Sequence, residues 1–381
     1  MTLSRRQTLA IIGGGVIAAA GGATAMVASR TPDVALAPWA KAGQYDDPRM
    51  RALSWAILAP NPHNMQPWQV DLSTDGEVWL YVDRTRLLPH TDPFNRQITI
   101  GLGCFLEVLR IAALEDGLAA EMMLFPEGSS DTGLDDRPVA RIRFVPTQRP
   151  GDPLFAQIQA RHTLKEPYDL TQPVSDAAMQ ALKSAVRYGA QFDYSLDPDH
   201  IAWLREVTHD ALRVEVETDA TYRESVDVMR IGAREVNANP DGIDFSGPMF
   251  EMLGATGVMT RASLLDQSST VFKQGMAAVL ENADTAMGHF WMMTQTNTRG
   301  DQIMLGCDWV RVHLAATAAG VDLQPLSQAL QEYPEVRPYY DAVHGRLAPQ
   351  GQTVQMLARV GYGPKMPPSP RWPIDAKVVN A

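Results

Sequence analysis

The residues of this chain best suited to chemistry are cations, amides and hydroxyls in two short, separated segments. The first is Ala59–Trp68, with the sequence APNPHNMQPW, and the second is Arg161–Tyr168, with the sequence RHTLKEPY. Phosphate groups favour guanidinium forks and ammonium charges, because charge-assisted hydrogen bonds are about twice as strong as neutral ones. If the second segment opens a helix, Arg161 and Lys165 lie on one face, since residues four apart are neighbours there. Both cations are therefore expected to converge on one phosphorylated ligand, and Thr163 can add a neutral hydroxyl.

The first segment combines a carboxamide with stiff backbone. Asn64 offers one acceptor and two donors, which can pair with hydroxyls or with the edge of a heterocycle. Pro60 and Pro62 restrict the approach to it, since each fixes its own φ and pushes the preceding residue toward an extended conformation. Taken singly, this segment is also typical of a loop leading into a half-buried strand, and the second of a solvated helix start.

Together the two segments resemble the FMN-dependent nitroreductase family. In that family a P-x-x-x-N-x-Q-P-W stretch and an R-[HR]-[ST]-x-[KR] stretch, supplied by different subunits of a homodimer, meet around one FMN. Two further matches follow in family order: Gly320–Gln328, where the family lays backbone amides near the flavin N5, and Gly361–Pro373, which resembles its closing strand and a downstream arginine. The resemblance implies FMN as the cofactor and an α+β, nitroreductase-like fold.

The resemblance also implies the roles of individual residues. The Lys165 position lies by the N1 and O2 edge of the ring, where a fixed positive charge stabilises reduced flavin, and Arg371 is carried over as a second phosphate ligand. The segment Gly320–Gln328 departs from the commoner acidic-glycine pair, which leaves hydride access open. His63 is a candidate proton donor; capping a loop turn is its alternative role, and solvent can supply the proton. The full predicted cofactor-binding set is Pro60, Asn61, Pro62, Asn64, Gln66, Arg161, His162, Thr163, Lys165, Ser327, Gln328 and Arg371.

An internal repeat explains how both halves of such a site can lie in one chain. Leu102-Gly103-Cys104 recurs as Leu305-Gly306-Cys307, and Gly320 follows Gly117 by the same interval of 203 positions. Each copy is a helical pattern ended by glycine, followed by an apolar stretch and then by residues 139–145 in one copy and 354–360 in the other. We therefore expect two tandem units that form a single-chain pseudo-dimer. A coincidental glycine and alanine helix pattern is the alternative.

The two copies lack opposite motifs. The first keeps the N-x-Q-P-W stretch, but Asp47–Arg51 only weakly echoes the R-H-T-x-K stretch, and in the second Tyr188–Tyr194 stands where N-x-Q-P-W would be. One FMN per chain is therefore predicted, between Asn64 of the first unit and the cations of the second.

The predicted organisation follows from breakers and composition along the chain. A helix is expected within 50–59 and a strand at 78–82, and Trp291 with its neighbouring methionines is expected in the core. Residues 239–250 form a breaker-rich loop that reads either as a lid over the flavin or as a surface excursion. The predicted segments are a signal at 1–25, a linker at 26–44, a first unit at 45–150, and a second unit at 151–375 with an inserted helical and lid region at 199–298.

The N-terminus resembles a twin-arginine export signal. Arg5 and Arg6 precede an apolar run, and Ala23-Thr24-Ala25 reads as a cleavage site. That route carries folded proteins and therefore suits a cofactor loaded before export. The export machinery is an expected partner. The expected location is the periplasm or another exported compartment. After cleavage no stable membrane span is expected. The run Gly13–Ala18 also matches a dinucleotide-binding fingerprint, but no strand of adequate length follows it.

Composition excludes several other classes. With 45% hydrophobic and 20% charged residues among 381, the chain reads as a soluble globular protein. A formal net charge of −11 argues against nucleic acid or anionic membrane as partner. Metal-binding motifs such as C-x-x-C and H-E-x-x-H do not occur, so no metal is predicted. Cys104 and Cys307 are expected to be buried thiols; a bridge between them is the alternative if their Cα atoms come within about 7 Å.

The predicted function is that of an exported FMN-binding oxidoreductase. A small-molecule donor reduces the flavin, and a nitroaromatic, quinone or similar acceptor then takes the electrons. The physiological donor and acceptor stay open, as does further oligomerisation. A flavin-sequestering protein with little turnover is the main alternative, and a structural protein without flavin is the third possibility.

Overall fold

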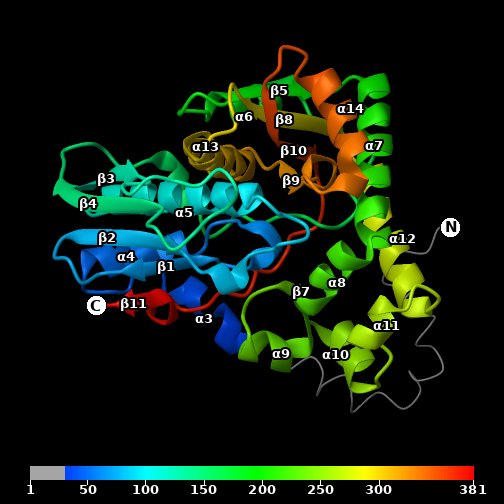
Figure 1. Cartoon of the computed structure of the whole chain (residues 1–381), viewed down its shortest axis with the longest axis horizontal. Coiled ribbons are helices and arrows are strands. Elements are labelled where there is room, and N and C mark those ends of the chain that lie inside the picture. The colour runs from blue at the N-terminus through cyan, green and yellow to red at the C-terminus, as the bar shows by residue number, and fades with distance from the viewer. Residues whose placement is uncertain (1–30) are drawn as a thin grey trace.

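The computed structural model describes residues 31–381, so the predicted export signal and the glycine run at 13–18 lie outside the described residues. The described chain forms a five-stranded, a four-stranded and a two-stranded sheet, surrounded by helices (Figure 1). The α+β class predicted from the sequence is confirmed.

The five-stranded sheet is built mainly from the first part of the chain. Its order is β11-β1-β2-β4-β3, and all its pairs are antiparallel except that between β11 and β1. The predicted strand at 78–82 is confirmed as β2, and most of the repeat segment 139–145 forms β4. The bounds are Trp68–Asp71 for β1, Glu77–Val82 for β2, Leu118–Leu124 for β3, Ala140–Pro146 for β4 and Val378–Asn380 for β11.

The four-stranded sheet has the order β5-β8-β10-β9, which repeats the chain-order pattern of β1-β2-β4-β3. Every residue of β8 is buried, including Trp291 and Met292, so their prediction as core residues is confirmed. The predicted insertion at 199–298 is too long, because β8 is a central strand of this sheet. The bounds are Gln191–Ser195 for β5, Gly288–Thr294 for β8, Asp322–Pro325 for β9 and Thr353–Gly361 for β10.

Two central helices of equal length pack against each other, α5 (Arg96–Glu115) and α13 (Arg299–Ala318). Their close approach requires glycine at two reciprocal positions. A methyl group on Gly103 would lie 2.2 Å from the carbonyl oxygen of Ile303, and one on Gly306 would lie 2.1 Å from that of Ile100. The glycines Gly117 and Gly320, which follow the two helices, have φ of +68° and +69°.

The two cysteines lie at the same crossing of α5 and α13 and are free thiols. The Cys104 Sγ donates to the Gly306 carbonyl at 3.2 Å, and the Cys307 Sγ donates to the Gly103 carbonyl at 3.4 Å. Burial raises the pKa of both thiols above the ordinary range. Helix α5 is long and apolar enough to cross a membrane, but 83% of its most apolar stretch is buried inside the protein.

Other helices cover the sheets and extend the second part of the chain. The region between β5 and β8 is almost entirely helical and also contains the two-stranded sheet of β6 and β7. The helices are α4 (Pro48–Ala56), α6 (Asp176–Ser184), α7 (Pro198–Glu217), α8 (Asp219–Asp227), α9 (Gly232–Ala238), α10 (Pro248–Ala255), α11 (Arg261–Leu265), α12 (Thr270–Asp284) and α14 (Arg337–Leu347); β6 is Met229–Ile231 and β7 is Ile243–Phe245. The 3-10 turns are η2 (Pro62–Asn64), η3 (Arg84–Arg86), η4 (Pro153–Gln157), η5 (Gln328–Leu330), η6 (Pro334–Val336) and η7 (Ile374–Lys377).

The predicted linker at 26–44 is wrong over much of its length, because Asp33–Lys41 forms helix α3. Ala35 and Trp39 on this helix are buried. The Trp39 indole donates to the Ser369 carbonyl at 2.7 Å, and the Ala35 carbonyl accepts from the Arg371 amide at 2.9 Å. Tertiary packing against the C-terminal segment therefore stabilises a helix that local composition did not indicate.

The segment after β10 crosses from the second sheet to the first. It carries Arg371 and ends in β11, which pairs in parallel with β1 at Val70 and Val378 (Figure 1). This crossing brings a late part of the chain beside the loop that contains Asn64.

Candidate functional site

The loop between α4 and β1 has a strained backbone. Of the five non-glycine residues with positive φ in residues 31–381, three lie here: His63 at +45°, Asn64 at +53° and Gln66 at +51°. Such conformations are costly for residues with a Cβ and persist only where surrounding structure enforces them, which is common at ligand sites. The Asn61 Oδ1 enforces this one by accepting from the Gln66 amide at 2.7 Å.

Gln66 joins this loop to two distant segments. Its side chain is fully buried; Nε2 donates to the Pro240 carbonyl at 2.7 Å, and Oε1 accepts from the Trp372 amide at 2.9 Å. The predicted cofactor residue Gln66 therefore uses its carboxamide to hold protein segments together.

Two arginines converge on the backbone that follows α4. Nη2 of Arg161 donates to the Leu58 carbonyl at 3.1 Å, and Nη2 of Arg371 donates to the same oxygen at 3.3 Å and to the Ala59 carbonyl at 3.2 Å. Arg371 also donates to Oδ1 of Asn64. The structure thus brings together the three residues that sequence reasoning drew from separate segments, at the carbonyl end of a helix, where cations are favoured.

These two guanidinium groups are both buried. Arg161 is 6% exposed and Arg371 is 2% exposed. Within residues 31–381 neither makes a salt bridge, and the Arg371 Nε lacks a hydrogen-bond partner. Burial lowers the pKa of Arg161 to about 10, and burial together with the Arg161 charge lowers that of Arg371 to about 9. Unpaired buried charges are costly, so this pair fits a ligand that brings negative charge, such as a phosphate.

Lys165 lies four residues after Arg161, and its side chain is solvent-accessible. Burial lowers the pKa of its ammonium group. His63 lies near enough for the Lys165 charge to act on it: burial and then that charge lower the His63 pKa to about 4. At neutral pH the imidazole is therefore uncharged, so His63 holds no extra proton to donate.

The other predicted residues differ in how much the surrounding protein engages them. The His162 ring is already used, since Nδ1 lies 3.0 Å from the Ala160 carbonyl and Nε2 lies 3.0 Å from Oδ1 of Asp322. Its predicted contact with the cofactor stays a prediction. The remaining predicted residues are all partly accessible: Pro60, Asn61, Pro62, Thr163, Ser327 and Gln328.

Glu215 and Asp241 are site residues that sequence reasoning missed. Glu215 lies near the end of helix α7 and accepts from Gln331 Nε2 at 2.7 Å. Asp241 accepts from the Trp372 indole at 2.7 Å and pairs with Arg230 at 2.7 Å. Both come from the inserted region, whose sequence carries no motif that would have singled them out.

Residues 240–242 lie directly against the strained loop. The Gly242 amide donates to the Asn64 carbonyl at 3.2 Å, beside the Gln66 bond to Pro240. A methyl group on Gly242 would lie 2.0 Å from the Val228 carbonyl oxygen, so only glycine lets the chain pass this close to Val228. The start of the predicted lid segment therefore covers the loop, and its later part forms β7 and the first turn of α10.

Two cavities flank the site and differ in character. One of about 610 Å³ lies between Met65, the apolar residues Leu87 and Leu88, and the helix α8 residues Asp219 and Arg223. Its wall thus includes the strained loop itself.

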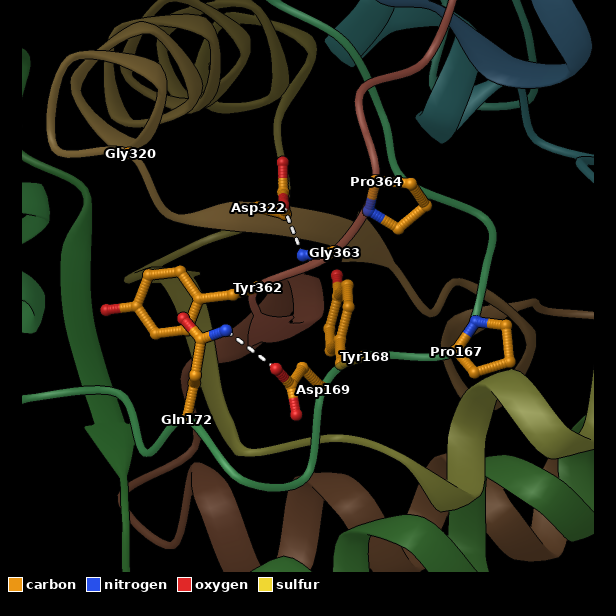
Figure 2. A pocket seen from close by; sticks show the side chains of 9 residues that line it. All are labelled: Pro167, Tyr168, Asp169, Gln172, Gly320, Asp322, Tyr362, Gly363 and Pro364. Atoms are coloured by element: carbon orange, nitrogen blue, oxygen red, sulfur yellow. Dashed lines mark hydrogen bonds between the residues drawn. The ribbon is translucent and has the colours of Figure 1, made fainter. Parts of the chain in front are cut away.

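The other cavity, of about 540 Å³, has a polar lining. Figure 2 shows Tyr168 and Tyr362 in its wall, with Asp322 bonded to the Gly363 amide and Gln172 bonded to Asp169. Carboxylates in the wall make it unsuited to a phosphate. Among the residues that the structure describes, no group of three or more His, Cys, Asp or Glu could hold a metal ion.

Comparison with known proteins shows what this chain is similar to. No protein-family model matches the chain. "Putative NAD(P)H nitroreductase acg" of Mycobacterium tuberculosis is 25% identical over 341 residues, which span 85% of this chain and 93% of that protein. "Putative NAD(P)H nitroreductase Rv3131" of the same organism is 26% identical over 332 residues, which span 84% and 87%. The chain is therefore similar, over most of its length, to proteins named as nitroreductases.

Among solved structures, a nitroreductase with bound FMN from Bacteroides fragilis aligns with 57% of this chain and 91% of its own. The identity is 14% and the TM-score is 0.33.

Proposed function

We propose that this protein is an FMN-binding oxidoreductase of the nitroreductase type, which passes electrons from a small-molecule donor to a nitroaromatic, quinone or similar acceptor. The observation that carries the proposal is the buried pair of Arg161 and Arg371, which has no salt-bridge partner among the described residues. The names of the M. tuberculosis relatives support the same class.

Different residues of the chain would bind different parts of the cofactor. Arg161 and Arg371 would bind the phosphate, because two desolvated guanidinium groups recover their burial cost when a dianion pairs with them. Lys165 would hold a positive charge at the ring edge, and Asn64 and Thr163 would supply polar contacts along the ribityl chain. Bound FMN supplies the two-electron chemistry, which the protein tunes through such charges.

We infer that the chain is a duplicated unit that holds one cofactor. The repeated strand order and the reciprocal α5–α13 contacts support the duplication. Beyond α6, the Arg311 Nε donates to the Ala185 carbonyl at 3.2 Å, much as Arg161 bonds the backbone beyond α4. There, however, Glu107 and Asp152 pair with Arg311 at 2.9 Å and 2.7 Å. A cation that is already neutralised offers little to a phosphate. The cleft around Arg311, which corresponds to the one around Arg161, would therefore bind no FMN.

The cavity beside Met65 is the proposed entry for the electron acceptor. It adjoins the strained loop, and its volume of about 610 Å³ suits a small aromatic molecule. Its apolar side would pack against the ring of the acceptor, and the charged groups of α8 would face its polar substituents.

Export by the twin-arginine route stays part of the proposal. It rests on the sequence of residues 1–25 alone. Outside the cytoplasm NAD(P)H would be scarce, so a different reductant would serve as the donor there.

The contact between the Gly242 amide and the Asn64 carbonyl favours a second candidate function. A lid that stays closed over the loop would keep FMN bound and exclude acceptors, as a flavin-sequestering protein requires.

A spectrum of the purified full-length protein tests the proposal. We expect the visible absorbance of bound flavin, release of FMN on denaturation, and about one FMN per chain by mass spectrometry. Rapid bleaching by NAD(P)H or dithionite, followed by reoxidation with a quinone or a nitroarene, would support the enzyme. Slow reoxidation with retained FMN would support sequestration, and a colourless protein that takes up no added FMN would refute both.

A further inference from the structure

Residues 161–168 lie in neither a helix nor a strand. Helical spacing therefore does not orient Lys165, and its position depends on the contacts that hold the backbone around it. The Leu164 amide donates to the Leu323 carbonyl at 3.2 Å, which fixes the segment to β9. The carbonyl oxygens of the same stretch are held by side chains of β10 and α12.

Arg359 of β10 binds the backbone on both sides of Lys165. Its Nη2 donates to the Leu164 carbonyl at 3.3 Å and to the Glu166 carbonyl at 2.8 Å. Between these two, the Lys165 carbonyl accepts from Asn282 Nδ2 at 2.9 Å. Two side chains thus hold three consecutive carbonyl oxygens, so the backbone of Lys165 is fixed while its side chain stays solvent-accessible.

The whole Arg359 side chain is enclosed by protein. The residue is 0% exposed, and its guanidinium centre lies 3.9 Å from the centroid of the Tyr168 ring. Nε donates to Oε1 of Gln324 at 2.7 Å, and Nη1 donates to Oγ1 of Thr285 at 3.1 Å. The same Thr285 oxygen accepts from the Tyr168 amide at 3.0 Å. Every nitrogen of the guanidinium group is therefore bonded, and the group cannot turn away from the two carbonyls.

A cation at this position is energetically costly for the fold. Arg359 lies between the buried residues Ala358 and Val360, in a strand with β8 on one side and β9 on the other. Its hydrogen-bond acceptors are neutral, and they compensate the desolvation of a charge less well than a carboxylate does. Apolar residues in place of buried charged groups are often as stabilising or more so. The core alone therefore does not account for Arg359, whereas the contacts beside Lys165 do.

We propose that Arg359 is a positioning residue for the cofactor edge, which acts through Lys165. The inference rests on the proposed function, in which the Lys165 ammonium lies beside the flavin ring. By fixing the backbone at Leu164 and Glu166, Arg359 limits how far that ammonium can move from the ring edge. A cation held there stabilises the reduced, negatively charged flavin more than one that samples several positions, because Coulomb energy falls with distance. Asn282 adds to the same restraint and carries no charge of its own.

The midpoint potential of bound FMN, measured in the full-length protein, tests this proposal. Lys165→Met should weaken the binding of reduced FMN relative to oxidised FMN about tenfold, which lowers the two-electron potential by about 30 mV. Arg359→Met and Asn282→Ala should each lower the potential too, by no more than K165M does. In the double variant R359M/K165M the change at Arg359 should add nothing, because its effect passes through Lys165.

Two comparisons separate positioning from charge and from general damage to the fold. N282A removes a neutral donor, so a lower potential in this variant cannot come from a lost charge. Arg49→Met is the matched control for R359M, because Nη1 of Arg49 also donates to three backbone carbonyls, at the turn between β1 and β2. R49M should keep the wild-type potential even if urea unfolding shows a loss of stability. In the flavin-free protein, the amides of Leu164 and Tyr168 should exchange hydrogen faster in R359M than in the wild type or R49M.

A wild-type potential in R359M, or in N282A where R359M does not fold, would overturn the role of Arg359. An equal shift on replacing Arg359 with and without Lys165 present would do the same, as would unchanged exchange of the two amides in R359M. A K165M variant that binds FMN with the wild-type potential would leave the proposed cofactor in place and remove this inference. If the wild type bound no FMN at all, the proposed function would fail first, and this inference with it.

Discussion

Replacing Arg161 by methionine should stabilise the flavin-free protein while weakening FMN binding. Burial lowers the Arg161 pKa from 12.5 to about 10. Since one pKa unit corresponds to about 1.4 kcal/mol, keeping this charge buried costs about 3 kcal/mol. Part of that cost is recovered by the hydrogen bond to the Leu58 carbonyl. This carbonyl keeps a donor in the variant, because Arg371 also bonds it. We expect the unfolding free energy of the flavin-free protein to rise by about 1–2 kcal/mol.

The effect on FMN has the opposite sign. One charge-assisted contact to a phosphate is worth about 1.5–3 kcal/mol, so the dissociation constant of FMN should rise about 10- to 100-fold. Urea unfolding of the flavin-free protein gives the first quantity, and quenching of FMN fluorescence on titration gives the second. Arg84→Met is the matched control: its ion pair with Asp136 is exposed, so both quantities should change little. An R161M variant with lower stability and unchanged FMN affinity would show that Arg161 is structural.

Three further changes have distinct expected outcomes. Gly306→Ala places a methyl group 2.1 Å from the Ile100 carbonyl oxygen, so α5 and α13 must separate, and urea unfolding should show a loss of about 2–4 kcal/mol. Gly242→Ala is strained at φ +75° and meets the Val228 carbonyl, so FMN should dissociate faster in stopped-flow fluorescence. Lys377→Met should flatten the pH dependence of unfolding above neutrality. Burial lowers the folded pKa of Lys377 to about 7, so between that pH and its usual pKa of 10.5 the unfolded chain binds more protons, and the wild type gains stability as pH rises.

Each of these expectations has a control or a contrary result. Gly345→Ala, in helix α14 with open space around it, should raise stability by up to about 1 kcal/mol, so a loss like that of G306A would show that any alanine is harmful. An unchanged FMN dissociation rate in G242A would remove residues 239–250 from the site. Parallel curves of unfolding free energy against pH for wild type and K377M would mean that the Lys377 pKa is not lowered.

The elements that local pattern specifies could be predicted from the sequence. Helices ended by Gly117 and Gly320, and the strand at 78–82, follow from periodicity and from the left-handed conformation that glycine permits. The meeting of Arg161, Arg371 and Asn64 could be predicted as well, because each belongs to a motif with a fixed order. Their binding of FMN stays a prediction.

Other features depend on tertiary packing, which the sequence does not reveal. Helix α3 forms because Trp39 is buried and its indole bonds the C-terminal segment. Every residue of β8 is buried, so no alternation of polar and apolar residues marks it as a strand. The expected insertion at 199–298 therefore extends into β8. Glu215, near the end of α7, accepts a hydrogen bond from Gln331, and no spacing along the chain encodes that contact. His162 belongs to a motif, but in the folded protein its ring Nε2 lies 3.0 Å from Oδ1 of Asp322, a contact that the motif does not reveal.

The crossing of the C-terminal segment sets the order in which the cation pair can form. Arg371 follows every strand of the four-stranded sheet in the chain, and it reaches Leu58 only when the stretch that ends in β11 has docked on β1. During synthesis, the first four strands and Arg161 therefore emerge from the ribosome long before the second guanidinium. A nascent chain can fold its earlier half, but it has no complete phosphate-binding pair until translation has passed Arg371.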